Sequence, residues 1–280
     1  MRTIRTKWLR LAFILLCAPV SIWYCALSAK PIIPYVELAI TEKCSLRCIH
    51  CANLMPCYDH PEHLPLDAVT RDIRRLLKGT RAIWVLQLLG GEPLLHPGLK
   101  ALLEELTQEK KIGRIQVVTN GTLLPTDDVL SQMKHKKVSV LISDYGPYSR
   151  KKDALIARLQ AAKVRYKLLD YSDWSDFGDL EKRNLSRETL ARSFHACASA
   201  QCKTLLGGHL YACPRSAHMV RLGRLADENA LDLTEEKDFA KRVLAFYNLP
   251  TIKACDHCNP PWARRPVPPG EQVSTKDKEK

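Results

Sequence analysis

The sequence contains no internal repeat at the spacing of solenoid proteins, which excludes a repeat architecture. It also contains no block of like charges, because its 43 lysines and arginines are scattered among 30 aspartates and glutamates. The net charge of +13 is compatible with an anionic partner such as nucleic acid, a phosphorylated substrate or a membrane surface. No recognisable RNA-binding module or aromatic–basic interleaving accompanies this charge, and DNA binding is not expected.

No apolar run is long enough for an unambiguous membrane span. Residues 1–10 carry four basic side chains, and residues 11–27 are apolar apart from Ser21. This outline is typical of a signal peptide or short anchor, but the run is short for a span and contains Pro19. We expect residues 1–34 to form an uncleaved helix that caps the domain or touches a membrane surface through residues 1–29. A true signal or anchor is the alternative.

The cysteines do not have the even, closely stapled pattern of a small secreted scaffold. There are 11 in 280 residues, and eight of them fall in two groups, at 44–51 and at 197–258. Such clustering favours metal binding over disulfides. It therefore favours a reducing compartment, and we expect a cytoplasmic protein, with membrane association as the alternative.

Apolar strand-like and helical segments alternate from residue 35 onward. Runs that are apolar on both faces, separated by helices, predict a parallel sheet covered by helices, and right-handed crossovers would curl it into an open or closed barrel. The expected strands are 35–40, 83–89, 114–119, 138–143 and 164–169, and the expected helices are 66–77, 99–106, 129–133 and 154–162.

Unusual polar or glycine-rich turns follow the first four of these strands. The cysteines of 44–51 follow the first strand, Gly90-Gly91-Glu92-Pro93 the second, Asn120-Gly121 the third and Asp144-Tyr145-Gly146 the fourth. Chemistry in parallel α/β sheets collects at the carboxyl ends of the strands. The sequence therefore predicts a site on this rim.

The pattern changes after residue 185. A helix at 188–195, a hairpin over 203–213 turning at Gly207-Gly208, and a Thr-capped helix at 234–247 are expected. We divide the chain into an N-terminal segment 1–34, a core domain 35–185, a small cysteine-rich domain 186–262 and a disordered tail 263–280.

The triplet CSLRCIHC at 44–51 is one ligand short of a closed metal site. Structural zinc with Cys57 or His50 as fourth ligand is one interpretation. CSLRCIHC, GGEP and TNG at successive strand ends resemble the radical S-adenosylmethionine (SAM) superfamily. This resemblance implies a partial (β/α)6 TIM-like barrel and a [4Fe-4S] cluster on Cys44, Cys48 and Cys51. SAM would chelate the fourth iron, and reductive cleavage would give a 5′-deoxyadenosyl radical.

The resemblance also implies roles for residues on the rim. Gly90 and Gly91 would let the backbone approach the methionine end of SAM, and Glu92 would bind its ammonium group. The position before the third cysteine, here His50, would lie near adenine. Residues expected near the ribose or the methionine carboxylate are Asn120, Ser143 and Asp144, for which ordinary turn chemistry is the alternative.

The second cysteine group resembles the C-terminal Twitch domain, a shortened relative of the SPASM domain. This resemblance implies a second, auxiliary [4Fe-4S] cluster, with structural zinc as the alternative. It leaves open which four of five cysteines are ligands: Cys197, Cys202, Cys213, Cys255 and Cys258.

The function implied is therefore that of a radical SAM enzyme that abstracts hydrogen from a peptide or protein side chain. The same chemistry on a carbohydrate or other small metabolite, such as dehydrogenation or epimerisation, is the second hypothesis. RNA modification is the third, and a non-enzymatic iron–sulfur or zinc protein the last. A flavodoxin- or ferredoxin-like electron donor is the expected partner.

Overall fold

The computed structural model describes residues 30–170, 174–226 and 229–273. The basic and apolar segment at residues 1–29, and with it the expected capping or membrane-associating helix, lies outside these ranges. In the described ranges, no helix combines the length and the hydropathy needed to cross a membrane.

The described chain is built on one eight-stranded sheet with the order β5-β4-β3-β2-β1-β6-β7-β8. Strands β1 to β6 run parallel, and β7 and β8 are antiparallel to their neighbours. The parallel strands are β1 (Ile32–Thr41), β2 (Ala82–Gly90), β3 (Ile112–Thr119), β4 (Val138–Asp144), β5 (Tyr166–Asp170) and β6 (Thr204–Leu206), followed by β7 (His209–Tyr211) and β8 (Leu231–Asp232).

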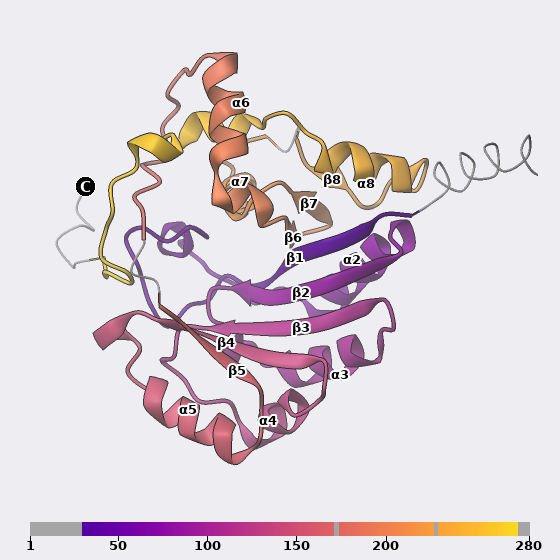
Figure 1. Ribbon diagram of the computed structural model, residues 1–280, viewed down its shortest axis with the longest axis vertical. Helices are drawn as coiled ribbons and strands as arrows, with labels where there is room; N and C mark the ends of the chain where they lie inside the picture. Colours follow the sequence, from indigo (N-terminus) through magenta and orange to yellow (C-terminus); the bar gives the residue numbers. More distant parts are fainter. Residues whose placement is uncertain (1–29, 171–173, 227–228, 274–280) are drawn as a thin grey trace, which may run out of the picture.

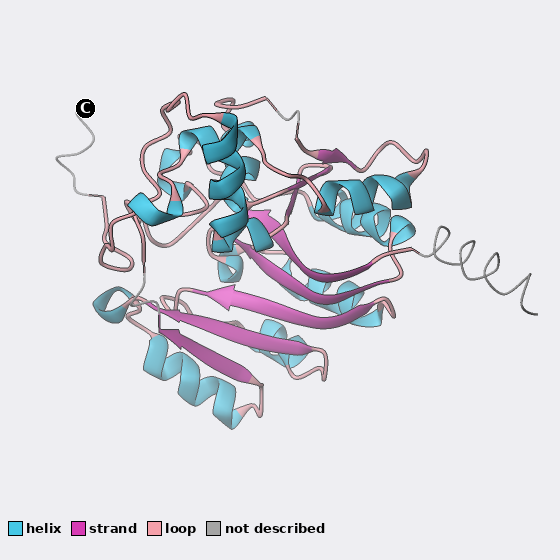
Figure 2. Ribbon diagram, turned by 45° about the horizontal axis from the view of Figure 1, so that its top comes forward, coloured by secondary structure: helices cyan, strands magenta, loops and turns pink. Residues whose placement is uncertain are grey.

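Helices that alternate with the first five strands cover one side of the sheet, which curves around its other side (Figures 1 and 2). They bury leucine and isoleucine side chains such as Leu76, Leu103 and Leu159 against the strands. The helices pack on this side of the sheet because their apolar residues recur at helical spacing. These helices are α2 (Leu66–Gly79), α3 (Leu99–Gln108), α4 (Asp127–Met133) and α5 (Lys152–Ala161). The open, TIM-like barrel of parallel strands is thereby confirmed.

The cysteine-rich region continues the same sheet. Strand β6 pairs in parallel with β1, through Glu37 beside Thr204, and turns into β7 at Gly207-Gly208 as expected. Both glycines have positive φ, which the tight hairpin turn requires. The helices of this region are α6 (Arg187–Ala196), α7 (Pro214–Arg221) and α8 (Phe239–Tyr247). Helix α7 packs on β6 and β7, α8 on β8 and α2, and α6 on the turn Lys253–His257 (Figure 1).

Two expectations for this region were wrong. The helix expected from Thr234 begins only at Phe239, because the Thr234 amide and hydroxyl both bond the Asp232 carboxylate in a turn, each at 2.7 Å. The tail expected to be disordered from residue 263 is instead hydrogen-bonded to two other segments as far as Val273. Residues 274–280 lie outside the described ranges.

Candidate functional site

A cavity of about 470 Å³ opens at the carboxyl ends of the parallel strands. Its volume is within the usual range of small-molecule sites. The rim residues that the sequence singled out converge here from four different loops, as expected for a parallel sheet. Eight of them line the cavity: Cys44, Cys48, His50, Cys51, Gly90, Gly91, Asn120 and Ser143.

The three cysteines of the loop after β1 are buried or half-buried free thiols. Burial raises the pKa of Cys44 and of Cys48 to about 12 and also raises that of Cys51. A thiol in such surroundings becomes a thiolate only when a bound cation compensates its charge. Three thiols on one cavity wall therefore fit an iron–sulfur cluster, whose irons supply that charge.

A single metal ion would need its ligands closer together than a cluster does. Within the described ranges, no three His, Cys, Asp or Glu side chains converge closely enough to hold one metal ion. A four-iron cluster is bound through separate irons, so its thiolates surround a larger volume. Cys57, the fourth zinc ligand considered above, is exposed and does not line the cavity.

Gly90 and Gly91 are required by the close packing of the β2 end on the cysteine loop. A Cβ on Gly90 would lie 2.1 Å from the Thr41 carbonyl oxygen, and one on Gly91 would lie 2.1 Å from that of Lys43. Backbone hydrogen bonds hold the two segments together, from Gly91 N to Thr41 O at 2.8 Å and from Glu92 N to Lys43 O at 2.9 Å. Only glycine allows this approach, and it brings the backbone to the cavity wall.

Glu92 does not line the cavity, contrary to the role expected for its carboxylate. It is fully buried and accepts hydrogen bonds from Leu94 N, the Thr119 hydroxyl and Asn120 N, at 3.0, 3.0 and 2.9 Å. Burial raises its pKa to about 7, against the lowering effect of these bonds. Its carboxylate therefore ties the loop after β2 to the end of β3. No ammonium contact is needed to satisfy it.

Asp144 is likewise outside the cavity. Its carboxylate forms an ion pair with Lys152 at 2.6 Å and accepts from Gly146 N at 3.0 Å, which is the turn chemistry considered as the alternative. Ser143, one residue earlier, does line the cavity. The strand alternation explains this difference, because successive side chains point to opposite faces.

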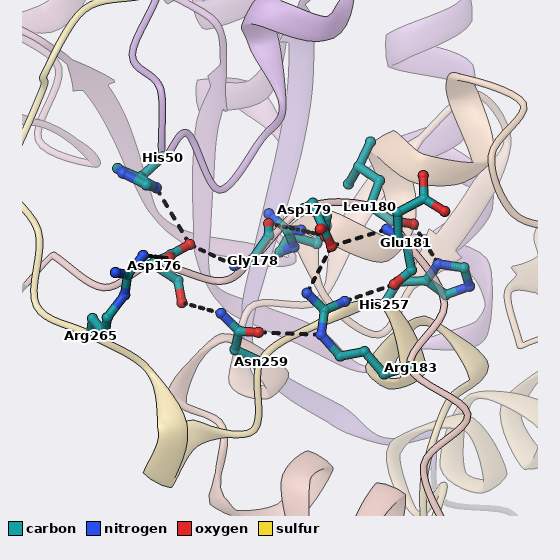
Figure 3. Close-up of polar contacts among 11 residues, drawn as sticks. His50, Asp176, Gly178, Asp179, Leu180, Glu181, Arg183, His257, Asn259 and Arg265 are labelled. Carbon is teal, nitrogen blue, oxygen red and sulfur yellow. Dashed lines mark hydrogen bonds and ion pairs between the residues drawn. The ribbon is translucent and has the colours of Figure 1, made fainter.

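Asn120 and His50 lie on the cavity wall. The Asn120 amide nitrogen donates to Ser45 Oγ at 3.0 Å and approaches Cys44 Sγ at 3.7 Å. His50 Nδ1 lies 3.5 Å from Asp176 Oδ1 (Figure 3). Asp176 belongs to the loop between β5 and α6, so this contact links the cysteine loop to the segment that leads into the cysteine-rich region. The structure thus places His50 where its ring is oriented by a carboxylate.

Four of the five cysteines in the second group lie together, and the fifth lies apart from them. Cys197, Cys213, Cys255 and Cys258 line a common pocket among Phe177, Phe194 and Ile252. Cys202 does not line it, and its thiol is instead hydrogen-bonded to Glu37 on β1. Burial raises the pKa of Cys213 to about 12 and also raises that of Cys255. These four half-buried thiols in one pocket again fit a bound cluster rather than free thiolates.

Arg215 gives independent support for an anionic occupant of this pocket. It lines the pocket, is 4% exposed, and its Nε lies buried without a hydrogen-bond partner. Its Nη2 donates to the carbonyls of Gly178 and Asp179. A buried, unpaired donor is costly unless a ligand accepts from it. His218, three residues further along α7, bonds the Tyr58 hydroxyl at 2.7 Å and lines neither the pocket nor the main cavity.

Sequence reasoning missed a polar floor in the main cavity. Glu37 on β1 and Gln87 on β2 are adjacent in register and both line the cavity. Glu37 is 6% exposed, and burial raises its pKa to about 7. The available signal was a polar residue inside each of two apolar parallel strands, since such a position is either satisfied internally or functional. Tyr145 on the wall belongs to the turn after β4 that the sequence singled out, whereas Trp174, Phe177 and Arg264 come from segments that carry no motif.

Comparison with known proteins agrees with the class that this geometry defines. Residues 38–165 match the family model of the radical SAM superfamily. This segment, which makes up less than half of the chain, is therefore a radical SAM domain. Members of this family use a [4Fe-4S] cluster and SAM.

Curated relatives match the same part of the chain. The GTP 3′,8-cyclase of Pelotomaculum thermopropionicum is 34% identical over 115 residues, which cover 39% of this chain and 34% of the relative. The GTP 3′,8-cyclase of Alkaliphilus oremlandii is 33% identical over 118 residues, covering 41% and 36%. The chain spans about a third of the length of these relatives.

A solved structure extends the likeness to most of the chain. The crystal structure of BtrN in complex with AdoMet and 2-DOIA superposes with a TM-score of 0.57 at 15% identity, covering 86% of this chain and 98% of BtrN. At this identity the likeness shows the fold alone. It includes the cysteine-rich region, because the covered share exceeds the radical SAM domain.

Proposed function

We propose that the chain is a radical SAM enzyme with an auxiliary iron–sulfur cluster, and that it oxidises a small, hydroxyl-bearing substrate. The observation that carries this proposal is the convergence of three buried thiols and a polar floor on one cavity, with a four-cysteine pocket beside it. When bound, the two clusters and SAM supply a reducing electron, a 5′-deoxyadenosyl radical and an acceptor for the electron that an oxidised substrate releases.

The residues of the chain hold these groups in place. Cys44, Cys48 and Cys51 would bind the first cluster and leave one iron for SAM. The backbone of Gly90 and Gly91 would form the wall against the methionine moiety, as their place on the cavity supports. Asn120 and Ser143 would offer hydrogen bonds to its polar groups, and His50 would lie near the base.

The auxiliary cluster is proposed on Cys197, Cys213, Cys255 and Cys258. Four thiols in one pocket, with Arg215 beside them, support this choice from the five candidates. Cys202 is left out because its thiol bonds Glu37. A cluster with four protein ligands has no open iron, which favours electron transfer over substrate ligation.

The polar floor supports a small substrate with hydroxyl groups. Glu37 and Gln87 lie inside the sheet and line the cavity, where the Tyr35 hydroxyl bonds both side chains and their remaining hydrogen-bonding capacity faces whatever fills the cavity. Thr204 holds Glu37 from the β6 side at 3.1 Å. Oxidation of a carbinol to a carbonyl would remove one hydrogen atom from carbon, taken by the radical, and then one proton from the hydroxyl and one electron, which the auxiliary cluster would accept.

A peptide or protein side chain is the second candidate. The observation in its favour is the aromatic wall of Tyr145, Trp174 and Phe177, which suits an extended apolar group. We rank it second because a short side chain entering from the rim would not use the hydrogen-bonding groups that Glu37 and Gln87 place on the cavity wall.

Anaerobic reconstitution tests the proposal. We expect about eight irons per chain, and 5′-deoxyadenosine release when SAM and dithionite are added. Cys48→Ala should abolish this release, whereas Cys57→Ala, which removes an exposed thiol outside the cavity, should retain it. Wild-type product from Cys48→Ala would exclude the assigned triplet.

Deuterium transfer distinguishes the substrate classes. Carbon-deuterated polyols and aminocyclitols, or deuterated peptides, are offered to the reconstituted chain. We expect deuterium in 5′-deoxyadenosine only from the hydroxylated small molecules, and a raised KM for them in Glu37→Gln. Transfer from peptides alone would favour the second candidate.

A further inference from the structure

The C-terminal strap, residues 259–273, follows the last cysteine and runs along the edge where the parallel strands end (Figure 1). It is anchored to the loop between β5 and α6. Asn259 N donates to Phe177 O at 2.8 Å, Asp176 N donates to Arg265 O at 2.9 Å, and Arg265 Nη2 bonds the Asp176 carboxylate at 3.0 Å. Figure 3 shows Asn259 and Arg265 of the strap bonded to this loop, with His50 on the other side of Asp176.

One end of the strap reaches the cysteine loop of the main cavity. Its backbone brackets Cys48, since Ile49 N donates to Glu271 O and Val273 N to Arg47 O, both at 2.8 Å. Between these bonds lies Gln272. Its amide oxygen accepts from Arg47 N at 2.7 Å, which fixes the amide so that its nitrogen donates to Cys48 Sγ at 3.4 Å.

The other part of the strap reaches the second cysteine pocket. Arg264 Nη2 donates to Cys197 Sγ at 3.3 Å, and its Nε donates to Asn259 O at 3.0 Å. The guanidinium lies over the Phe177 ring, 4.2 Å from its centroid. Arg264 and Phe177 line both the pocket and the main cavity, so Arg264 lies between the two cysteine groups.

We propose that the C-terminal strap sets the reduction potentials of both clusters, through Gln272 at Cys48 and Arg264 at Cys197. Hydrogen bonds to ligand sulfurs stabilise the more negative, reduced state of a cluster and so raise its potential. The neutral amide acts on the first cluster, and the cationic donor, which is the stronger, on the auxiliary cluster. The auxiliary centre is thereby the better electron acceptor. Both are positioning residues, and this inference rests on the proposed function.

The test is a redox titration of the reconstituted full-length chain followed by electron paramagnetic resonance. Gln272→Leu should lower the equilibrium constant for reduction of the SAM-responsive cluster about tenfold, equal to about 59 mV for one electron, and leave the other signal unchanged. Arg264→Met should lower the equilibrium constant for reduction of the auxiliary cluster about tenfold and leave the SAM-responsive signal unchanged. Arg264→Lys, which keeps the charge, should restore most of the loss.

Two control variants change the strap without touching a sulfur. Glu271→Gln changes only a side chain, because Glu271 contacts Ile49 N through its backbone oxygen. Arg265→Gln removes a charge next to Arg264. Both should keep wild-type potentials, and an equal shift from Arg265→Gln would overturn the assignment to Arg264. Should Gln272→Leu lose iron, Gln272→Asn, which shortens the amide's reach, gives the same comparison.

Failure of this inference is distinct from failure of the proposed function. Wild-type potentials in Gln272→Leu, Gln272→Asn and Arg264→Met, with full iron content, would overturn the role of the strap alone. A wild-type chain that assembles no cluster, or shows no SAM-responsive signal, would overturn the proposed function and this inference with it.

Discussion

Replacing Gly91 with alanine should damage the cluster loop more than the fold. The added Cβ would meet Lys43 O at 2.1 Å, Lys43 C at 2.5 Å and Cys44 Cβ at 3.0 Å. Real contacts do not approach so closely, so backbone 43–44 must move by about 1 Å. This movement breaks the bond from Glu92 N to Lys43 O, which costs about 0.5–1.5 kcal/mol, and overpacking adds about 1–3 kcal/mol.

The expected loss is therefore about 2–4 kcal/mol in the free energy of unfolding, measured by urea denaturation of the iron-free chain. The displaced Cys44 should also halve the iron content and abolish 5′-deoxyadenosine formation. Gly146→Ala is the control, because its Cβ meets nothing within 4 Å and only its positive φ of 57° is penalised, by about 1–2 kcal/mol. Wild-type iron, product and stability in Gly91→Ala would refute this reasoning.

Three further outcomes are expected. Burial lowers the pKa of His218 to about 3 from an ordinary 6.5. The wild type should therefore lose up to about 1.4 kcal/mol of unfolding free energy per pH unit as pH falls from 6.5 toward 3. Urea midpoints of His218→Phe, measured over the same pH range, should lack this slope. Glu92→Gln should cost about 1–3 kcal/mol in unfolding free energy at neutral pH, because an amide nitrogen replaces an acceptor of buried donors; an unchanged urea midpoint would contradict this. Cys202→Ala should retain full iron content whereas Cys255→Ala should lose about half of it, and equal iron losses would place Cys202 among the ligands.

The sequence was sufficient to predict the parallel sheet and the position of its site. Strands with apolar residues on both faces, alternating with helices, have few other ways to bury their surface, and the carboxyl ends of such strands meet on one edge. The loops carrying Cys48, Gly91, Asn120 and Ser143 therefore had to converge. The hairpin at Gly207-Gly208 was predictable because its turn chemistry is local.

Side-chain direction was not predictable in the same way. Glu92 and Asp144 stand in the motif-bearing turns, yet the carboxylate of Glu92 turns to the end of β3 and that of Asp144 pairs with Lys152 at the start of α5. The strap was missed because proline-rich composition indicates disorder, while its order comes from backbone bonds to residues more than 80 positions away. Nothing local in the sequence around Gln272 reports that its partner is Cys48.

Cys44, Cys48 and Cys51 are proposed to bind a cluster with one iron left for SAM. The most direct measurement is electron paramagnetic resonance of the reduced, anaerobically reconstituted chain with and without SAM. Addition of SAM should change the g values of one cluster signal and leave the auxiliary signal as it was. A spectrum that SAM does not alter, in a chain whose iron content is complete, would contradict the claim.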